Sequence, residues 1–194
     1  LVNVYGEQRF GRGGANVEAG IAALSGRGPR RGKTGKADLI VSAGQSALFN
    51  LYAQIRAERG LLDTVLLGDV LQKRETGGMF VCEDPVTDQG RLEAGELVVT
   101  GPMFGGHMRS PTPESPAAML EQEVLEQGGI RPNALAKLGR RVPGTRRPIR
   151  VWPTELHVEP APAISEPALD PGLTLRFVLP PGSYATVLLR EIMG

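Results

Sequence analysis

Apolar residues recur along the chain with two spacings, and each spacing predicts a different kind of element. Helical spacing is clearest at Leu48, Leu51, Tyr52 and Ile55, which share one face of a helix. Gly60 is the expected end of that helix, because glycine commonly follows the last helical turn. Further helices are predicted over residues 16–25, from Ser115-Pro116 onward, over residues 133–138 and over residues 183–193. Asn16, Ser115 and Ser183 are their expected N-caps.

Strand character appears where apolar and β-branched residues gather between turn residues. Such segments cover residues 70–71, 79–81, 96–100, 149–152, 156–158 and 173–179. Gly77-Gly78 is expected to join the first two as a hairpin, and Gly101-Pro102 to end the third. Because helices and strands mix without a regular βαβ order, the predicted fold class is α+β.

Composition narrows the class of protein. The 194 residues include 26 Gly and 16 Pro, which predicts many turns, yet 41% hydrophobic content is enough for a core. The single cysteine excludes an internal disulfide framework. His107 and His157 are the two histidines and lie far apart in the sequence, so a metal site is not expected. No apolar run approaches the roughly 20 residues of a membrane span. We expect a soluble cytoplasmic protein.

The net charge of +1 conceals strong local blocks. Residues 1–37 carry seven basic and two acidic side chains, and residues 131–150 carry seven basic and none acidic. Residues 38–130 between them carry six basic and fourteen acidic side chains. Two basic blocks around an acidic middle are typical of a surface that binds a polyanion. Two solvated basic loops would give the same pattern, and charge alone does not separate the two interpretations.

Other candidate sites have simpler explanations. Residues 28–34 end in Gly-Lys-Thr but have three residues between the glycines, where a phosphate-binding P-loop needs four. Cys82 lies in an apolar run and is interpreted as a buried structural residue rather than a nucleophile. His107 and His157 are interpreted as surface or packing residues. Ser183 lacks the Gly-x-Ser-x-Gly context of a catalytic serine.

Two end segments are unusually dense in residues that recognise nucleic acid. Residues 3–12 read NVYGEQRFGR and combine two aromatic rings, two amides and two arginines. Such a mixture suits an unstacked base, because rings stack on it, amides reach its edge and arginines bind phosphate. Residues 179–191 read LPPGSYATVLLRE and follow a strand, turn and helix pattern with Tyr184 at the helix start. Core packing of Tyr5, Phe10 and Tyr184 is the alternative.

Both segments resemble signature motifs of the tRNA pseudouridine synthase D (TruD) family. NVYGEQRFGR is similar to the family motif N-Y-F-G-x-Q-R-F-G, with Val4 and Tyr5 as departures, and LPPGSYATVLLRE is similar to its C-terminal signature. Between them SALFN, LLGDVLQ, FVCED, TGPMFGG and GTRRP resemble the family in the same order. The resemblance covers the whole chain.

The resemblance implies a pseudouridine-synthase catalytic domain with a mixed sheet, interrupted by an α/β insertion domain. Residues 1–37 and 148–194 would belong to the catalytic domain and residues 38–147 to the insertion. The implied partner is tRNA, in which a uridine is converted to pseudouridine, and no cofactor or metal is implied. The target base has to leave its stack to be reached.

The resemblance also implies roles for individual residues. Substrate-binding residues would be Asn3, Tyr5, Gln8, Arg9, Phe10 and Tyr184. The two basic blocks separately predict that the RNA backbone is bound by Arg12, Arg140, Arg141, Arg146 and Arg147. The catalytic aspartate of the family lies upstream of the first motif. None of Asp38, Asp63, Asp69, Asp84, Asp88 and Asp170 has the matching context. This chain alone is therefore expected to be inactive, as part of an enzyme. The alternative is a non-catalytic RNA-binding module derived from the same fold.

Overall fold

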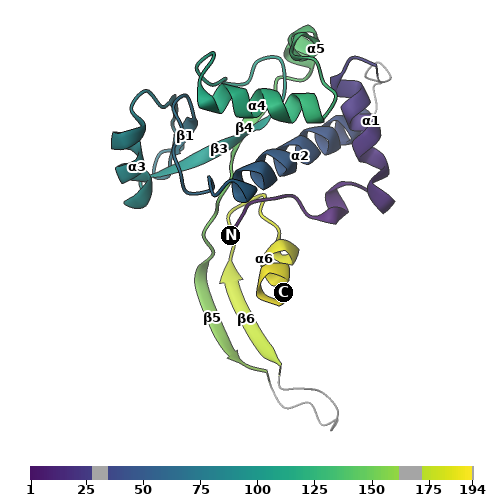
Figure 1. The fold of residues 1–194 in the computed structure, drawn as a ribbon. Coiled ribbons are helices and arrows are strands. Elements are labelled where there is room, and N and C mark those ends of the chain that lie inside the picture. The colour runs from purple at the N-terminus through teal and green to yellow at the C-terminus, as the bar shows by residue number, and fades with distance from the viewer. Residues whose placement is uncertain (28–34, 162–171, 194) are drawn as a thin grey trace.

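The computed structural model describes residues 1–27, 35–161 and 172–193, in which helices and a sheet form a body and a β-hairpin projects from it (Figure 1). The helices are α1 (Ala15–Leu24), α2 (Gly35–Glu58), α3 (Pro85–Glu93), α4 (Pro116–Gln127), α5 (Pro132–Leu138) and α6 (Ala185–Met193). The strands are β1 (Val70–Lys73), β2 (Met79–Val81), β3 (Leu97–Met103), β4 (Thr145–Pro148), β5 (Thr154–Pro160) and β6 (Leu173–Val178). Short 3-10 turns are η1 (Glu7–Arg9), η2 (Arg12–Gly14) and η3 (Gly139–Arg141). The α+β class is confirmed, and every described strand pairing is antiparallel.

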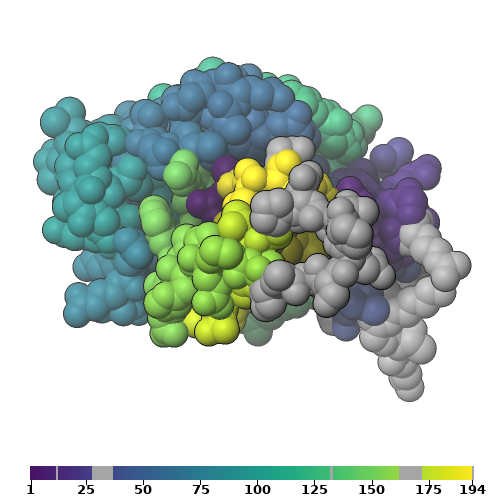
Figure 2. Space-filling view, turned by 90° about the horizontal axis from the view of Figure 1, so that it is seen from below, coloured from purple at the N-terminus to yellow at the C-terminus, as the bar shows by residue number. Residues whose placement is uncertain are grey.

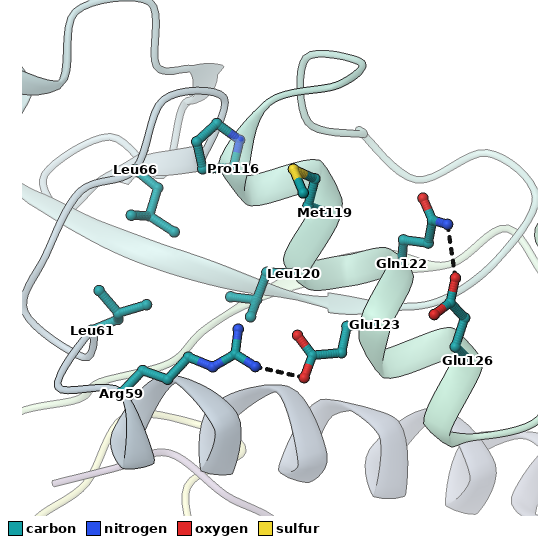
Figure 3. Close-up of a pocket in the computed structure, with 9 residues that line it drawn as sticks. All are labelled: Arg59, Leu61, Leu66, Pro116, Met119, Leu120, Gln122, Glu123 and Glu126. Atoms are coloured by element: carbon teal, nitrogen blue, oxygen red, sulfur yellow. Dashed lines mark hydrogen bonds and ion pairs between the residues drawn. The ribbon is translucent and has the colours of Figure 1, made fainter.

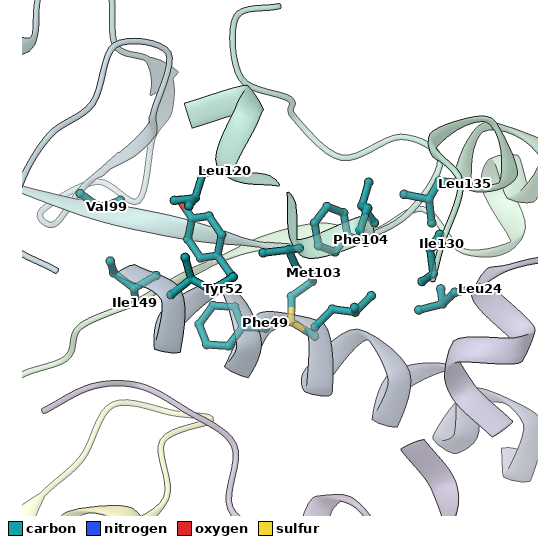
Figure 4. Close-up of a cluster of buried hydrophobic side chains, with 14 of the residues drawn as sticks. Leu24, Phe49, Tyr52, Val99, Met103, Phe104, Leu120, Ile130, Leu135 and Ile149 are labelled. Atoms are coloured by element: carbon teal, nitrogen blue, oxygen red, sulfur yellow. The ribbon is translucent and has the colours of Figure 1, made fainter. Parts of the chain in front are cut away.

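The sheet of the body has the strand order β2-β1-β3-β4. The long helix α2 packs against β3 and α4, so the core lies between helices and sheet (Figure 4). Phe49 and Tyr52 of α2 meet Met103 of β3 in this core, and Leu120 of α4 covers them. All four residues are at most 6% exposed.

Two buried ion pairs tie the body together. Arg56 of α2 binds Asp69 through two hydrogen bonds of 2.8 and 3.0 Å and also donates to the Tyr52 hydroxyl. Arg146 of β4 lies 2.6 Å from Glu121 of α4. Burial raises the pKa of Glu121, because a carboxylate loses its hydration in the interior.

Glycines allow the closest approaches between elements. A Cβ at Gly20 of α1 would lie 2.5 Å from the backbone nitrogen of Gly44 in α2, so the two helices touch backbone to backbone. A Cβ at Gly101 would lie 2.8 Å from the Phe49 ring. The missing side chain leaves room for that ring. β3 continues through Gly101 and Pro102, which pair with Arg147 and Arg146 of β4, instead of ending before them as the sequence predicted.

The β5–β6 hairpin forms a second, two-stranded sheet, with α6 beside it (Figure 1). Val158 lies opposite Leu175, and Pro160 lies opposite Leu173. Opposed residues of antiparallel strands share a face, so one face of the hairpin is apolar. Val158 is 58% and Leu173 64% exposed, in contrast to the buried apolar residues of the body.

The predicted elements recur with three local differences, whereas the helix α3 and the strand β4 were not predicted from the sequence. Gly14, with a φ of 76°, precedes α1 in place of the expected cap Asn16. Residues 149–152 contribute only an isolated bridge between Val2 and Arg150, because the strand itself lies earlier, at β4. The Ser183 hydroxyl donates to Asn3 Oδ1, whereas the expected cap would accept from a backbone N–H at the start of α6. The Ser115 cap and the Gly77-Gly78 hairpin are confirmed.

Candidate functional site

The N-terminal segment is held along the chain that follows β4. The backbone nitrogen of Asn3 donates to Ile149 O at 2.8 Å, and Val151 N donates to Leu1 O at 3.0 Å. Seen from below in Figure 2, purple N-terminal residues lie between the green β5 segment and the yellow C-terminal segment. The two motifs from opposite ends of the sequence therefore meet at one place.

Asn3 joins the two motifs through its side-chain amide. Its Oδ1 accepts from Arg147 at 2.6 Å and from the Ser183 hydroxyl at 3.2 Å, while its Nδ2 donates to Pro148 O at 2.9 Å. Asn3 is only 5% exposed. Both acceptor positions of the amide oxygen are thus used within the protein, and one amide N–H remains for a further acceptor.

Tyr5 forms an aromatic cluster with Tyr184 and Phe49. Its ring centre lies 5.8 Å from each of the other two, in edge-to-face arrangements. Asn50 of α2 fixes the backbone of Tyr5, accepting from its nitrogen at 2.8 Å and donating to its oxygen at 2.9 Å. Tyr5 and Tyr184 are both half-buried, so ring surface remains accessible. Edge-to-face contact orients the two tyrosines relative to each other.

The remaining residues of the first motif lie beside this cluster. The Arg9 guanidinium lies 5.6 Å from the Tyr5 ring centre and donates to Ser42 and Ser46 of α2. Gln8 is exposed and donates to Thr186 of α6 at 3.3 Å. Phe10, at the end of η1, is half-buried. Asn3, Tyr5, Gln8 and Tyr184 are therefore brought together, with Arg9 adjoining them.

The five arginines expected to bind the RNA backbone occupy different environments. Arg140 and Arg141 lie exposed in η3, and Arg12 lies in η2. Arg146 does not reach the surface, because it is bound by Glu121 and Thr100 in the core, with its side chain 1% exposed. We therefore remove it from the expected RNA-contacting set.

Arg147 is also engaged within the protein. It donates to Asn3 O, to Asn3 Oδ1 and to Gly182 O, and its guanidinium lies over the Tyr5 ring. Burial lowers the pKa of this guanidinium below its ordinary value. The guanidinium is thus part of the wall of the candidate site.

The structure does not favour a catalytic role for the cysteine, histidines and aspartates considered in the sequence analysis. Burial, followed by a hydrogen bond with Asp88, raises the pKa of the Cys82 thiol to about 12, which disfavours a reactive thiolate. His107 and His157 are exposed. Residues 28–34, with the Gly-Lys-Thr sequence, lie outside the described residues. Asp69 pairs with Arg56, and Asp84 caps α3.

The described residues offer neither a metal cluster nor a membrane-spanning helix. No group of three His, Cys, Asp or Glu side chains among them is arranged to hold a metal ion. Within the same part of the chain, no helix is both long and apolar enough to cross a membrane.

An open groove of about 560 Å³ lies elsewhere, between α4 and the chain that follows α2 (Figure 3). Leu61, Leu66 and Met119 contribute apolar surface to it, and Arg59 pairs with Glu123 across it at 2.6 Å. None of the residues lining it belongs to either end motif. We therefore place the candidate site at the meeting point of the motifs and not in this groove.

Sequence reasoning missed Asn50 and the bridging role of Arg147. Asn50 is polar between apolar neighbours in α2, and a polar residue at such a position was the available signal. Arg147 was hidden in a basic block, because charge counting does not distinguish a surface arginine from one that faces inward.

Comparisons with known proteins identify the family of the chain. The family described as "tRNA pseudouridine synthase D (TruD)" matches residues 36–192. This chain belongs to the TruD family. It is 40% identical over its whole length to a tRNA pseudouridine synthase D of Anaeromyxobacter sp. strain Fw109-5, of which it covers 54%. It is 41% identical to a tRNA pseudouridine synthase D of Thermus thermophilus, over 98% of this chain and 49% of the relative.

A solved structure supports the fold. The crystal structure of the putative TruD from Methanosarcina mazei superposes with a TM-score of 0.77 at 20% identity, over 99% of this chain and 60% of that one. The chain spans about half the length of the curated relatives that it matches.

Proposed function

We propose that this chain is the portion of a tRNA pseudouridine synthase that builds one wall of the uridine pocket. The observation that carries the proposal is the cluster in which Asn3 and Tyr5, from the first motif, meet Ser183 and Tyr184, from the last. Motifs 180 positions apart are brought into contact there, as a shared site requires.

The proposed chemistry is an isomerisation, so product and substrate have the same atomic composition. The bond between ribose C1′ and uracil N1 breaks, the base turns, and a bond forms between C1′ and uracil C5. The hydrogen at C5 leaves as a proton and N1 takes one up, so no net oxidant or reductant is needed. The half-buried rings of Tyr5 and Tyr184 offer faces for the extruded base. The remaining amide N–H of Asn3 would donate to a uracil carbonyl.

The attacking aspartate would come from the part of the relatives that this chain does not span. The domain division belongs to the same proposal, with residues 1–37 and 148–194 in the catalytic domain and residues 38–147 in the insertion. The projecting β5–β6 hairpin supports it, because two isolated strands with an exposed apolar face are marginally stable in water. The remainder of the catalytic domain would cover that face.

A tritium-release assay tests the proposed function. The longest natural reading frame that contains this chain is incubated with a tRNA transcript carrying tritium at uridine C5, and isomerisation releases the label into water. We expect release by the long polypeptide and none by this chain alone, since loss of an attacking group costs several powers of ten. RNA binding without release by the long polypeptide would instead favour a non-catalytic module.

Tyr184 provides the matched pair of variants for this assay. Tyr184→Ala is expected to slow the reaction about 5- to 150-fold, because stacking contributes about 1–3 kcal/mol per base. Tyr184→Phe keeps the ring and is expected to react at nearly the original rate. A large loss of melting temperature without a rate defect in the folded fraction would remove Tyr184 from the pocket.

RNA binding is proposed to involve Arg12, Arg140 and Arg141. Affinity for single-stranded RNA should fall with salt by a log–log slope of roughly 0.7 per phosphate contacted. Arg140→Ala with Arg141→Ala should flatten that slope, whereas Arg59→Ala, which removes a cation paired with Glu123, should not. A slope unchanged by the double substitution would show that η3 does not bind phosphate.

A further inference from the structure

Arg147 lies where the two motifs of the candidate site meet, and its side chain binds both. Its Nε and Nη2 donate to the backbone oxygen of Asn3 at 3.1 and 3.0 Å, and Nη2 also donates to Asn3 Oδ1 at 2.6 Å. From the other side, Gly182 O accepts from Nη2 at 2.9 Å. One guanidinium therefore links the N-terminal segment to the turn before α6.

The same guanidinium orients the aromatic cluster. Its central carbon lies 4.2 Å from the centre of the Tyr5 ring and 5.4 Å from that of Phe49. A cation over an aromatic face is attracted to it, and more strongly where water is excluded. The planar fork of arginine can stack and donate hydrogen bonds at the same time, whereas a lysine ammonium cannot. Arg147 thus contacts both the backbone and the ring that form the wall.

The strand that carries Arg147 is itself anchored in the body. Neighbouring residues of a strand face opposite sides, and Arg146 accordingly faces the core, where it binds Glu121 at 2.6 Å and Thr100 O at 2.9 Å. Gly182 leaves little room on the site side, since a Cβ there would lie 3.3 Å from Nη1 of Arg147. The guanidinium is therefore held from behind by β4 and enclosed in front by the turn.

We propose that Arg147 is a positioning residue of the uridine site, one that holds Asn3, Tyr5 and the turn before α6 in a single arrangement. This replaces the expectation that it binds an RNA phosphate, because its Nε and Nη2 already donate to Asn3 and Gly182. The inference rests on the proposed function, since these residues form a uridine site only if the protein acts on uridine.

The experiment compares variants of the longest natural polypeptide that contains this chain. Arg147→Lys, Arg147→Ala and the control Arg91→Ala are assayed by single-turnover tritium release at saturating tRNA, and their tRNA affinities are measured at several salt concentrations. Arg91 is a matched control, because its guanidinium is also held by hydrogen bonds and lies 5.5 Å from an aromatic ring centre, that of Phe80. Its partners are the carboxylates of Asp88 and Glu96, and it lies on α3, away from the candidate site. All rates are taken well below each variant's melting temperature.

A positioning role predicts a specific pattern. Arg147→Ala and Arg147→Lys should react about 100-fold more slowly, since displacements near 1 Å can cost that much, while the salt slope of binding stays unchanged. Millimolar guanidinium chloride should partly restore the rate of Arg147→Ala, and methylammonium should not. Arg91→Ala should react at the original rate.

Other outcomes overturn the inference. A flattened salt slope with an unchanged saturated rate would make Arg147 a phosphate contact. An original rate in folded Arg147→Lys and Arg147→Ala, or failure of both variants to fold, would make it a purely structural residue. An unaltered polypeptide that releases no tritium would instead refute the proposed function, and the inference with it, whereas a slow variant beside an active parent supports both.

Discussion

The body and the β5–β6 hairpin contain similar apolar residues but bury them to different extents. Val70, Leu71 and Val99 of the body are at most 1% exposed. Leu156, at 52%, and Leu173, at 64%, are mostly exposed in the hairpin. Burying such side chains supplies about 25 cal/mol per Å², so the body has gained this free energy and the hairpin largely has not.

This difference indicates where the stability of the chain resides. Two buried ion pairs and a continuous hydrophobic core hold the body together. The hairpin has backbone pairing and few buried side chains, so its order should depend on whatever covers its apolar face. Substitutions in the two regions should therefore have very different costs.

The largest effect is expected at the ion pair of Arg56 and Asp69. Arg56→Ala would leave the Asp69 carboxylate buried without its partner and should lower the free energy of unfolding by about 3–5 kcal/mol. Arg59→Ala removes an exposed ion pair with Glu123 and should cost at most about 1 kcal/mol. Urea titrations followed by circular dichroism measure both. Equal losses would show that the buried pair contributes no more than the exposed one.

A smaller effect is expected where α1 crosses α2. Gly20→Ala places a methyl group 2.4 Å from Ile40 O and should cost about 1–3 kcal/mol of stability. Gly90→Ala in α3 meets no atom within 4 Å and should instead stabilise the chain by somewhat under 1 kcal/mol, because alanine favours helix more than glycine. Thermal melts of the two variants should shift in opposite directions. A stabilising Gly20→Ala would contradict the close crossing.

The raised pKa of the Cys82 thiol predicts that the stability of the body depends on pH. Its thiol pKa is about 12 in the folded chain and about 8.5 when unfolded, so the folded state retains a proton that the unfolded state loses. The contribution of this thiol to the free energy of unfolding is therefore complete below about pH 8.5. It falls by about 1.4 kcal/mol per pH unit as the pH rises toward 12. Cys82→Ala should show a flatter decline in urea titrations across this range. Parallel curves would contradict the raised pKa.

The smallest effect is expected in the hairpin. Val158→Thr places a hydroxyl at a position that is 58% exposed and should change stability by no more than about 0.5 kcal/mol. The same change at Val99, which is 1% exposed in β3, buries the hydroxyl and should cost about 1–3 kcal/mol. A substantial loss at Val158 in this chain would show that the hairpin already contributes to a core.

Helices and turns were predicted correctly from the sequence where residues close to one another in the chain determine them. The apolar face of α2, the Ser115 cap and the Gly77-Gly78 turn depend on neighbouring residues, and the structure confirms each. The extension of β3 through Gly101 was not readable, because it depends on rings of α2 that pack against the missing side chain. Local turn signals suggest an end at that glycine, whereas tertiary packing requires a strand.

The candidate site was predictable in its motifs but not in its internal contacts. Tyr5 and Tyr184 followed from resemblance, whereas the opposite orientations of Arg146 and Arg147 required knowledge that β4 is a strand. Glu121 was an overlooked signal for Arg146, because it interrupts the apolar stripe of α4 four residues after Ala117 and four before Leu125. An acid on a buried stripe predicts a buried cation nearby.

The meeting of Asn3 with residues near the other end of the chain also orders events during synthesis. Asn3 can form its hydrogen bonds with Ile149 and Arg147 only after about 145 further residues have been made. Synthesis of that length takes on the order of ten seconds on a ribosome. Until then the body can collapse around α2, and Tyr5 can already bind Asn50, while Asn3 still lacks its partners. Contacts of such separation form late and carry a high loop-closure cost. The candidate site would be completed only as the C-terminal motif leaves the ribosome.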